Sequence, residues 1–142
     1  MELRARALRL LARREHTRQE LERKLSPHSE SSEALKDLVS NLKAKNQFSE
    51  ERYAEERARK LGRKYGAAKI RQDLKARGVP DDLIARVSSA PDELEKARAI
   101  LERKYRAPAA TREEKAKRMR FLQSRGFSSE VIFKLLSARD AA

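Results

Sequence analysis

Three pairs of adjacent basic residues recur at one position of an amphipathic pattern: Arg13-Arg14, Arg63-Lys64 and Arg103-Lys104. The planar guanidinium of Arg binds phosphate or carboxylate through two hydrogen bonds, and Lys adds a compact charge. Helical phase puts each pair at the edge of an apolar stripe, so we expect stacked repeats to align the pairs along one surface. Such a surface suits a polyanion or an acidic protein groove. The alternative is a solvated face on which long side chains cover apolar surface with their stems.

Four further basic residues are expected on the middle helices of the later repeats: Arg71, Lys75, Lys117 and Arg120. They are the most plausible contact surface if the three pairs are solvated. Together with the pairs, they form the set of candidates for binding nucleic acid or a protein filament.

The sequence contains no arrangement of residues suited to catalysis or metal binding. His16 and His28 have no partner at metal-ligand spacing, there is no Cys, and we expect both histidines at the surface. The acidic pairs Glu50-Glu51, Asp81-Asp82 and Glu113-Glu114 fall in first helical turns, where the helix dipole accounts for them. We therefore predict that the chain is not an enzyme and uses no metal, no cofactor and no small-molecule substrate.

The net charge of the chain is strongly positive and evenly distributed. The formal charge is +13, and residues 1–48, 49–90 and 91–142 contribute +4, +4 and +5. The excess therefore comes from the whole chain and not from a basic tail. A field of one sign along a surface attracts polyanions, of which nucleic acid is the first candidate.

The pattern of apolar and basic residues occurs three times. Residues 61–65 return as residues 101–105, with a weaker copy at 11–15, and residues 74–84 return as 122–132. A period near 48–50 residues is typical of repeat proteins, in which each unit buries its apolar face against its neighbours. We predict three tandem three-helix repeats, forming an elongated, curved array. The predicted repeats are 1–47, 48–89 and 90–142.

Helical periodicity is present throughout and no strand pattern is found, so the predicted fold class is all-α. The first helix is expected over roughly residues 2–15. Thr17–Glu20 and Thr111–Glu114 each have the sequence of a capping box, in which the Thr hydroxyl and the Glu carboxylate satisfy each other's backbone N–H.

Glycines mark the expected helix ends. In the second repeat, the first helix should run through Tyr65 and end at Gly66. Gly78 and Gly126 each precede an apolar residue, which predicts a left-handed helix C-cap closed by that residue.

The helix–glycine turn–helix segments 74–87 and 122–136 are similar to a DNA-reading helix-turn-helix. However, Asp81-Asp82 in one copy and Glu130 in the other occupy the start of the helix that would read bases, where carboxylates repel phosphate. We therefore favour a structural turn. A free-standing DNA-binding or architectural protein remains the alternative function.

No apolar run approaches the ~20 residues that a membrane span needs, and the first residues have no secretory signal pattern. We expect a soluble, cytoplasmic monomer with no membrane partner.

Three segments resemble the signatures of the RecX regulatory family. Residues 47–54 followed by 65–79 are similar to its central signature, 120–132 to its C-terminal signature, and 7–21 to its N-terminal signature. The resemblance covers almost the whole chain in the right order. Two departures are that Ser26–Ser29 replaces the glycine turn in the first repeat, and that Ser49 stands where the family has an acidic residue.

The resemblance implies a modulator of the RecA recombinase, built from three three-helix repeats. Family members engage the RecA–DNA filament, block its extension or promote its disassembly, and so limit strand exchange and co-protease activity in DNA repair and the SOS response. The implied partners are the RecA filament and single- or double-stranded DNA within it. The family has no catalytic residues to carry over.

Overall fold

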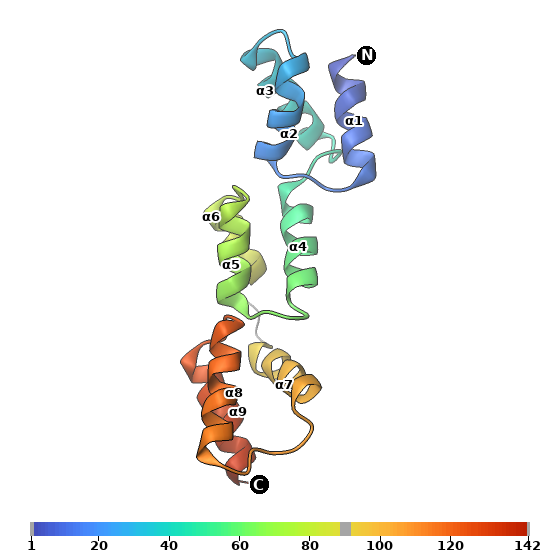
Figure 1. Ribbon diagram of the computed structural model, residues 1–142. Coiled ribbons are helices and arrows are strands. Elements are labelled where there is room, and N and C mark those ends of the chain that lie inside the picture. The colour runs from blue at the N-terminus through green and yellow to red at the C-terminus, as the bar shows by residue number, and fades with distance from the viewer. Residues whose placement is uncertain (1, 89–91, 142) are drawn as a thin grey trace. The chain divides into compact units, whose positions relative to one another are not determined.

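The computed structural model describes residues 2–88 and 92–141, and this part of the chain is entirely helical (Figure 1). It contains nine α-helices and one short 3₁₀ turn, which confirms the all-α prediction. The elements are α1 (Leu3–Arg13), α2 (Arg18–Leu25), η1 (Ser26–His28), α3 (Ser32–Ala44), α4 (Glu50–Leu61), α5 (Ala67–Ala76), α6 (Asp81–Ser88), α7 (Glu93–Lys104), α8 (Arg112–Ser124) and α9 (Ser129–Ala141).

The chain divides into two compact units that cut across the helices of the second repeat. Unit 1 comprises Met1–Arg57 and Leu74–Ile84, and unit 2 comprises Ala58–Asp73 and Ala85–Ala142. Helices α4, α5 and α6 therefore each contribute residues to both units. Unit 1 thus combines the first predicted repeat with part of the second, and unit 2 combines the third predicted repeat with the remainder of the second. The repeat boundaries drawn from the sequence stay a prediction.

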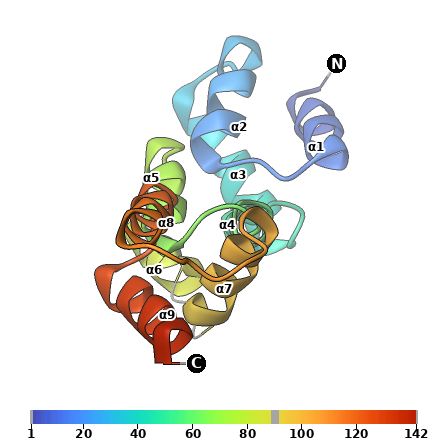
Figure 2. The same cartoon turned by 60° about the horizontal axis from the view of Figure 1, so that its bottom comes forward.

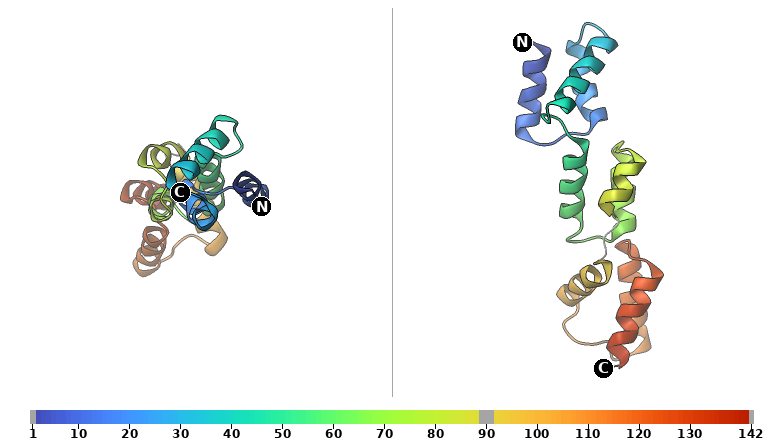
Figure 3. Two further views of the ribbon diagram at one scale, coloured as in Figure 1. Left: turned by 90° about the horizontal axis from the view of Figure 1, so that it is seen from above. Right: turned by 180° about the vertical axis from the view of Figure 1, so that it is seen from behind.

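Unit 1 is built on the packing of α1 and α3 against α2 (Figure 3). Its apolar cluster consists of buried residues from these helices together with one residue from the connection between α3 and α4: Ala7, Leu21, Leu25, Leu35, Val39, Leu42 and Phe48. Removing such side chains from water is the main stabilising contribution, at roughly 25 cal/mol per Å² of apolar surface.

Unit 2 contains the mutually packed helices α7, α8 and α9 (Figure 2). Its buried apolar cluster is Ala97, Ile100, Leu101, Leu122, Phe127, Ile132, Leu135 and Leu136. Tyr105 is partly buried and packs against this cluster. Ala97 and Leu101 thus form part of the buried face of α7.

The two Thr caps differ in their reciprocal bond. At Thr17 the capping box is complete, because the hydroxyl accepts from the Glu20 N–H and the Glu20 carboxylate accepts from the Thr17 N–H. At Thr111 the hydroxyl accepts from the Glu114 N–H at 3.1 Å, but the Glu114 carboxylate accepts from the Ala110 N–H at 2.7 Å. The second capping box was therefore wrong in its reciprocal half, because the approaching loop offers a closer N–H.

Both predicted glycine caps are confirmed. Gly78 has φ 82° and Gly126 has φ 92°, and both turns close with the paired hydrogen bonds of a Schellman motif. The sequence analysis missed a third cap of this kind at Asn46, with φ 60°, at the end of α3. Asn is the residue type that most often replaces Gly in this conformation, because its short polar side chain tolerates positive φ.

Helix α4 ends four residues earlier than predicted, at Leu61 instead of Tyr65. The N–H of Lys64 donates to the Leu61 carbonyl at 3.0 Å, which tightens the last turn, and the Gly66 N–H donates to Arg125 O at 2.7 Å. These bonds use groups that a continuing helix would need. Arg63 and Lys64 consequently lie in the connecting turn and not on the helix.

The expectation that both histidines lie at the surface was wrong for His16, which is 1% exposed, and right for His28. The Nδ1 atom of His16 lies 3.0 Å from the Arg14 carbonyl, and Nε2 lies 3.3 Å from Lys24 Nζ. Because an ammonium group can only donate, Nε2 accepts and Nδ1 carries the proton. Burial lowers the pKa of His16 below 6.5, which keeps this neutral form in place.

Candidate nucleic-acid interface

Unit 2 contains a groove of about 390 Å³ that brings together two of the three predicted basic pairs. The pairs Arg63-Lys64 and Arg103-Lys104 come from the turn after α4 and from the end of α7, which are forty residues apart in sequence. The full lining is Arg63, Lys64, Ile100, Arg103, Lys104, Phe121 and Arg125. Five of these seven side chains are basic and none is acidic, so the groove suits an anionic ligand.

The turn that carries Arg63 and Lys64 is held by two arginines of the same groove. The guanidinium of Arg103 donates to the Arg63 carbonyl, and Arg125 Nη1 donates to the Lys64 carbonyl at 3.3 Å. These bonds satisfy carbonyls left free at the end of α4. Each guanidinium has five N–H donors, so both arginines keep donors for a ligand.

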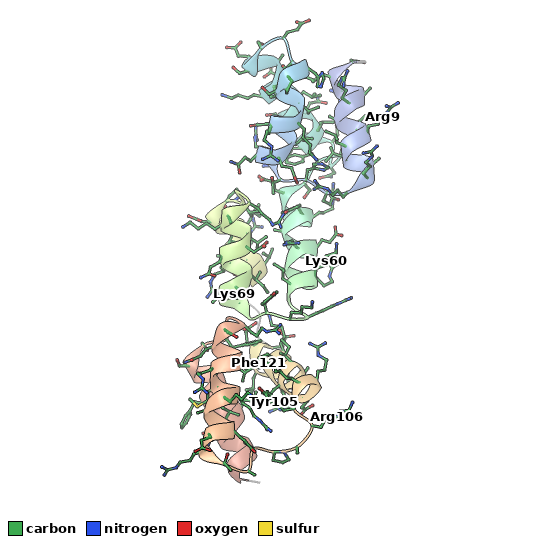
Figure 4. The ribbon with its side chains drawn as sticks, viewed as in Figure 1. Arg9, Lys60, Lys69, Tyr105, Arg106 and Phe121 are labelled. Carbon is green, nitrogen blue, oxygen red and sulfur yellow. The ribbon has the colours of Figure 1, made fainter. Side chains whose placement is uncertain are left out.

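An aromatic side chain lies between the cations of the groove. Lys104 Nζ lies 4.5 Å from the centre of the Phe121 ring, and the Arg125 guanidinium lies 4.9 Å from it. The Tyr105 ring packs edge-on against Phe121, with centroids 6.0 Å apart and an interplanar angle of 84° (Figure 4). The ring fixes both cations through cation–π contacts and adds an apolar surface to a basic groove.

Sequence reasoning missed Phe121, Arg125 and Ile100 as part of this groove. A signal was available for Arg125, because it directly precedes Gly126 and the Schellman cap fixes its place at the helix end. For Phe121 and Ile100 the signal was their position beside the buried residues Leu122 and Leu101, at the border of the apolar stripe.

Arg118 is a buried basic residue of α8, with 7% of its surface exposed. Its guanidinium lies 4.5 Å from the centre of the Tyr105 ring, and its Nε has no hydrogen-bond partner. It occupies the register that Leu21 and Ile70 hold in the other repeats. In the third repeat, the face of the Tyr105 ring therefore packs against a guanidinium group at a position where the other two repeats have an apolar side chain.

The third predicted pair belongs to unit 1, and its two members differ. Arg14 forms a bidentate pair with Glu20, at 2.9 and 3.0 Å. The hydrogen bond raises the pKa of Arg14, and the same bond is the main reason why the pKa of Glu20 falls to about 2. Arg14 is therefore engaged within the protein. Arg13 is exposed and lines a separate pocket of unit 1.

The four other candidates are exposed, and they line neither the unit 2 groove nor the unit 1 pocket. Arg71 and Lys75 lie on α5, and Lys117 and Arg120 lie on α8. Their contribution to binding stays a prediction.

In residues 2–88 and 92–141, no group of three or more His, Asp or Glu side chains could hold a metal ion. None of the helices described is both long enough and apolar enough to cross a membrane.

Models of three RecX domains match the chain in sequence. The first three-helix domain of RecX matches residues 4–30, the second matches 49–87 and the third matches 91–136. The chain belongs to the RecX family. It is 38% identical to the regulatory protein RecX of Ralstonia nicotianae, an alignment that covers 99% of this chain and 90% of the relative. The RecX of Leptothrix cholodnii is 39% identical with the same coverage, and that of Chromobacterium violaceum is 40% identical over 95% of this chain and 89% of its own.

The fold is also that of solved RecX structures. The crystal structure of RecX from Lactobacillus salivarius superposes with a TM-score of 0.85 at 20% identity, covering 99% of this chain and 96% of its own. A second RecX crystal structure gives 0.72 at 23% identity, over 96% and 73%. The prediction of three tandem three-helix repeats is confirmed by these matches and by the three domain models.

Proposed function

We propose that this chain is a regulatory protein that binds the RecA recombinase filament on DNA and limits its extension. Strand exchange and co-protease activity would be reduced as a consequence, in DNA repair and in the SOS response. Its relatives carry the name regulatory protein RecX, which supports the regulatory role. The unit 2 groove is the contact surface in this proposal.

The single observation that carries the proposal is the composition of that groove. Arg63, Lys64, Arg103 and Lys104 line one groove without an acidic residue, although the chain contains 22 Asp and Glu residues. A structural network would be expected to pair such cations with carboxylates. An anion-binding surface keeps its cations available for phosphate, or for the carboxylates of a partner protein.

The test of the function uses the cognate recombinase on single-stranded DNA. We expect the purified protein to inhibit DNA-dependent ATP hydrolysis and strand exchange at substoichiometric amounts. Absence of inhibition with the protein in excess would contradict the proposal. Sequence-selective protection of duplex DNA without recombinase would instead support the free-standing DNA-binding alternative.

The test of the surface uses Arg63→Glu combined with Lys64→Glu. We expect inhibition of strand exchange to weaken and its salt dependence to flatten, since each lost phosphate contact reduces the log–log slope by about 0.7 on a single strand. Lys43→Glu with Lys45→Glu, on two exposed residues at the end of α3, changes the charge equally and is the matched control. Equal losses in both variants would mean that the total charge matters and the groove does not.

A further inference from the structure

A second basic groove lies within unit 1, between α1 and the segment formed by α2 and η1. It encloses about 510 Å³ and is lined by Arg6, Arg9, Leu10, Arg13, Lys24, Leu25 and His28. The residues on α1 are spaced three and four apart, which puts them on one face of the helix. No acidic side chain lines this groove, and Leu10 and Leu25 supply its apolar part.

The two grooves occupy equivalent places in the first and third repeats. On the first helix of each repeat, Leu10 and Arg13 correspond to Ile100 and Arg103, ninety positions later. On the second helix and the turn after it, Lys24 and His28 correspond to Phe121 and Arg125, ninety-seven positions later. Four positions line both grooves. The same junction of first and second helix therefore forms a basic groove twice.

Three arginines of unit 1 outside the groove pair with carboxylates. Arg14 pairs with Glu20, Arg18 with Glu22 at 2.9 Å, and Arg52 with Glu15 at 2.8 Å. The ion pairs thus lie away from the groove.

The arginines that line the groove have no such partners. Among residues 2–88 and 92–141, no carboxylate pairs with Arg6, Arg9 or Arg13, and the buried Nε of Arg6 has no hydrogen-bond acceptor at all. A buried N–H without an acceptor is unfavourable, because it has left water without gaining a partner. Arg9 projects from α1 and is exposed (Figure 4).

Lys24, the lysine of this groove, is held by a buried histidine. Lys24 Nζ donates to Nε2 of the buried His16 at 3.3 Å, and His16 is itself fixed by the Arg14 carbonyl. This contact holds the ammonium group of a groove-lining side chain without neutralising its charge. The groove therefore has one cation that is positioned by a neutral partner.

We propose that this groove binds the sugar–phosphate backbone of a nucleic-acid strand. From Arg6 to Arg13, α1 rises about 10 Å, at roughly 1.5 Å per residue. A row of this length can contact more than one phosphate of the same strand, whereas a small anion would occupy only part of it. A row of guanidinium groups over an apolar floor suits a strand better than it suits one small anion. The inference rests on the proposed function only for the class of ligand and needs no contribution from the unit 2 groove.

The experiment measures binding of a fluorescent thirty-nucleotide oligothymidylate by anisotropy over a range of NaCl concentrations. The combined change Arg6→Gln, Arg9→Gln and Arg13→Gln should reduce the log–log salt slope by about 2, since each contact contributes about 0.7. Arg9→Gln alone, at an exposed residue that does not endanger folding, should reduce it by about 0.7. The matched control is Lys36→Gln, Lys43→Gln and Lys45→Gln, which removes the same charge from exposed positions of unit 1 outside the groove.

The inference is overturned if the groove variants and the control lower the slope equally, or if Arg9→Gln leaves it unchanged. It is also overturned if the groove variants bind the oligonucleotide normally but lose affinity for poly-glutamate, because the partner is then an acidic protein. A failure of the proposed function has a different signature. In that case the protein does not inhibit the recombinase, while the DNA salt slope still depends on Arg6, Arg9 and Arg13.

Discussion

The two glycine turns have the same internal geometry but meet different neighbours. In unit 1, a Cβ on Gly78 would lie 2.0 Å from the side-chain oxygen of Gln19. In unit 2, a Cβ on Gly126 would lie 2.7 Å from the backbone nitrogen of Lys69. The first neighbour is the end of a flexible side chain, whereas the second is the main chain of a helix.

Backbone hydrogen bonds account for the main-chain contact in unit 2. The Gly66 N–H donates to Arg125 O at 2.7 Å, and the Ala68 N–H donates to Gly126 O at 3.2 Å. The turn after α8 thereby satisfies free N–H groups at the start of α5. At the equivalent place in unit 1, the start of α2 has its own capping box at Thr17. One turn motif thus contacts a neighbouring repeat either through side chains or through the main chain, depending on whether the neighbour caps itself.

The largest effect is expected from substitutions at the backbone contact of unit 2. Gly126→Ala should destabilise the protein by about 2–4 kcal/mol, because a strained positive φ is combined with a clash against main-chain atoms. Gly66→Ala tests the same contact from the other side, since its Cβ would lie 2.6 Å from the Gly126 carbonyl oxygen. Urea denaturation gives the free energy of unfolding, and a loss below 1 kcal/mol in both variants would contradict the main-chain contact.

A smaller effect is expected in unit 1. Gly78→Ala should be unfavourable by about 1 kcal/mol, because the positive φ remains strained while Gln19 can move away. A double-mutant cycle with Gln19→Ala separates the two contributions. We expect the double variant to be no less stable than the sum of the single changes predicts. If Gly78→Ala destabilises the protein as much as Gly126→Ala, the side-chain contact and the main-chain contact of the two turns do not differ in cost.

The pH dependence of stability should also distinguish the units. Unit 1 has a buried histidine, His16, at the position where the second repeat has Tyr65, a residue type that does not titrate near neutral pH. Burial lowers the pKa of His16 below 6.5, so the unfolded chain takes up a proton before the folded protein does. Stability is therefore complete above about pH 6.5 and falls as the pH decreases below that value, with a slope of at most ~1.4 kcal/mol per pH unit.

The measurement is urea denaturation between pH 7.5 and pH 5.0. His16→Gln should remove this part of the slope, and His28→Gln, at the exposed histidine of the same unit, is the matched control. An unchanged slope in His16→Gln would mean that the buried ring does not contribute to it.

The smallest change in stability is expected at the unit 2 groove. Arg63→Glu with Lys64→Glu should alter the free energy of unfolding by no more than about 0.5 kcal/mol, because both side chains are exposed and their backbone carbonyls, not their charges, accept the bonds from Arg103 and Arg125. A large loss of stability would make the pair a structural element of the junction. Circular dichroism melting is sufficient to detect it.

Periodicity was enough to predict the helices, the repeats and both glycine caps, since these depend on local spacing. The end of α4 at Leu61 could not be predicted, because it depends on a carbonyl of Arg125, sixty-four residues away. The burial of His16 likewise depends on its packing, which no local pattern encodes.

The candidate site was predicted in part. The joining of Arg63-Lys64 with Arg103-Lys104 followed from their common register, and the structure brings these four residues to one groove. The engagement of Arg14 by Glu20 was missed, although Glu20 had already been assigned to the capping box. The unit 1 groove was missed because Arg6 and Arg9 have no counterpart among the recurrent pairs. A comparison of the repeats therefore does not single out these two arginines.

Two carboxylates at helix starts have a consequence for engineering. Glu50, the first residue of α4, accepts from the Arg18 N–H at 3.0 Å, and Glu93, the first residue of α7, accepts from the Ala67 N–H at 3.1 Å. Each later repeat thus completes the start of a helix in the repeat before it. A domain swap, a circular permutation or a repeat insertion that cuts at the repeat boundary would separate an acceptor from its donor. An exchanged segment should therefore contain both the glutamate and the helix start whose N–H group it accepts from, and should not be a single three-helix repeat.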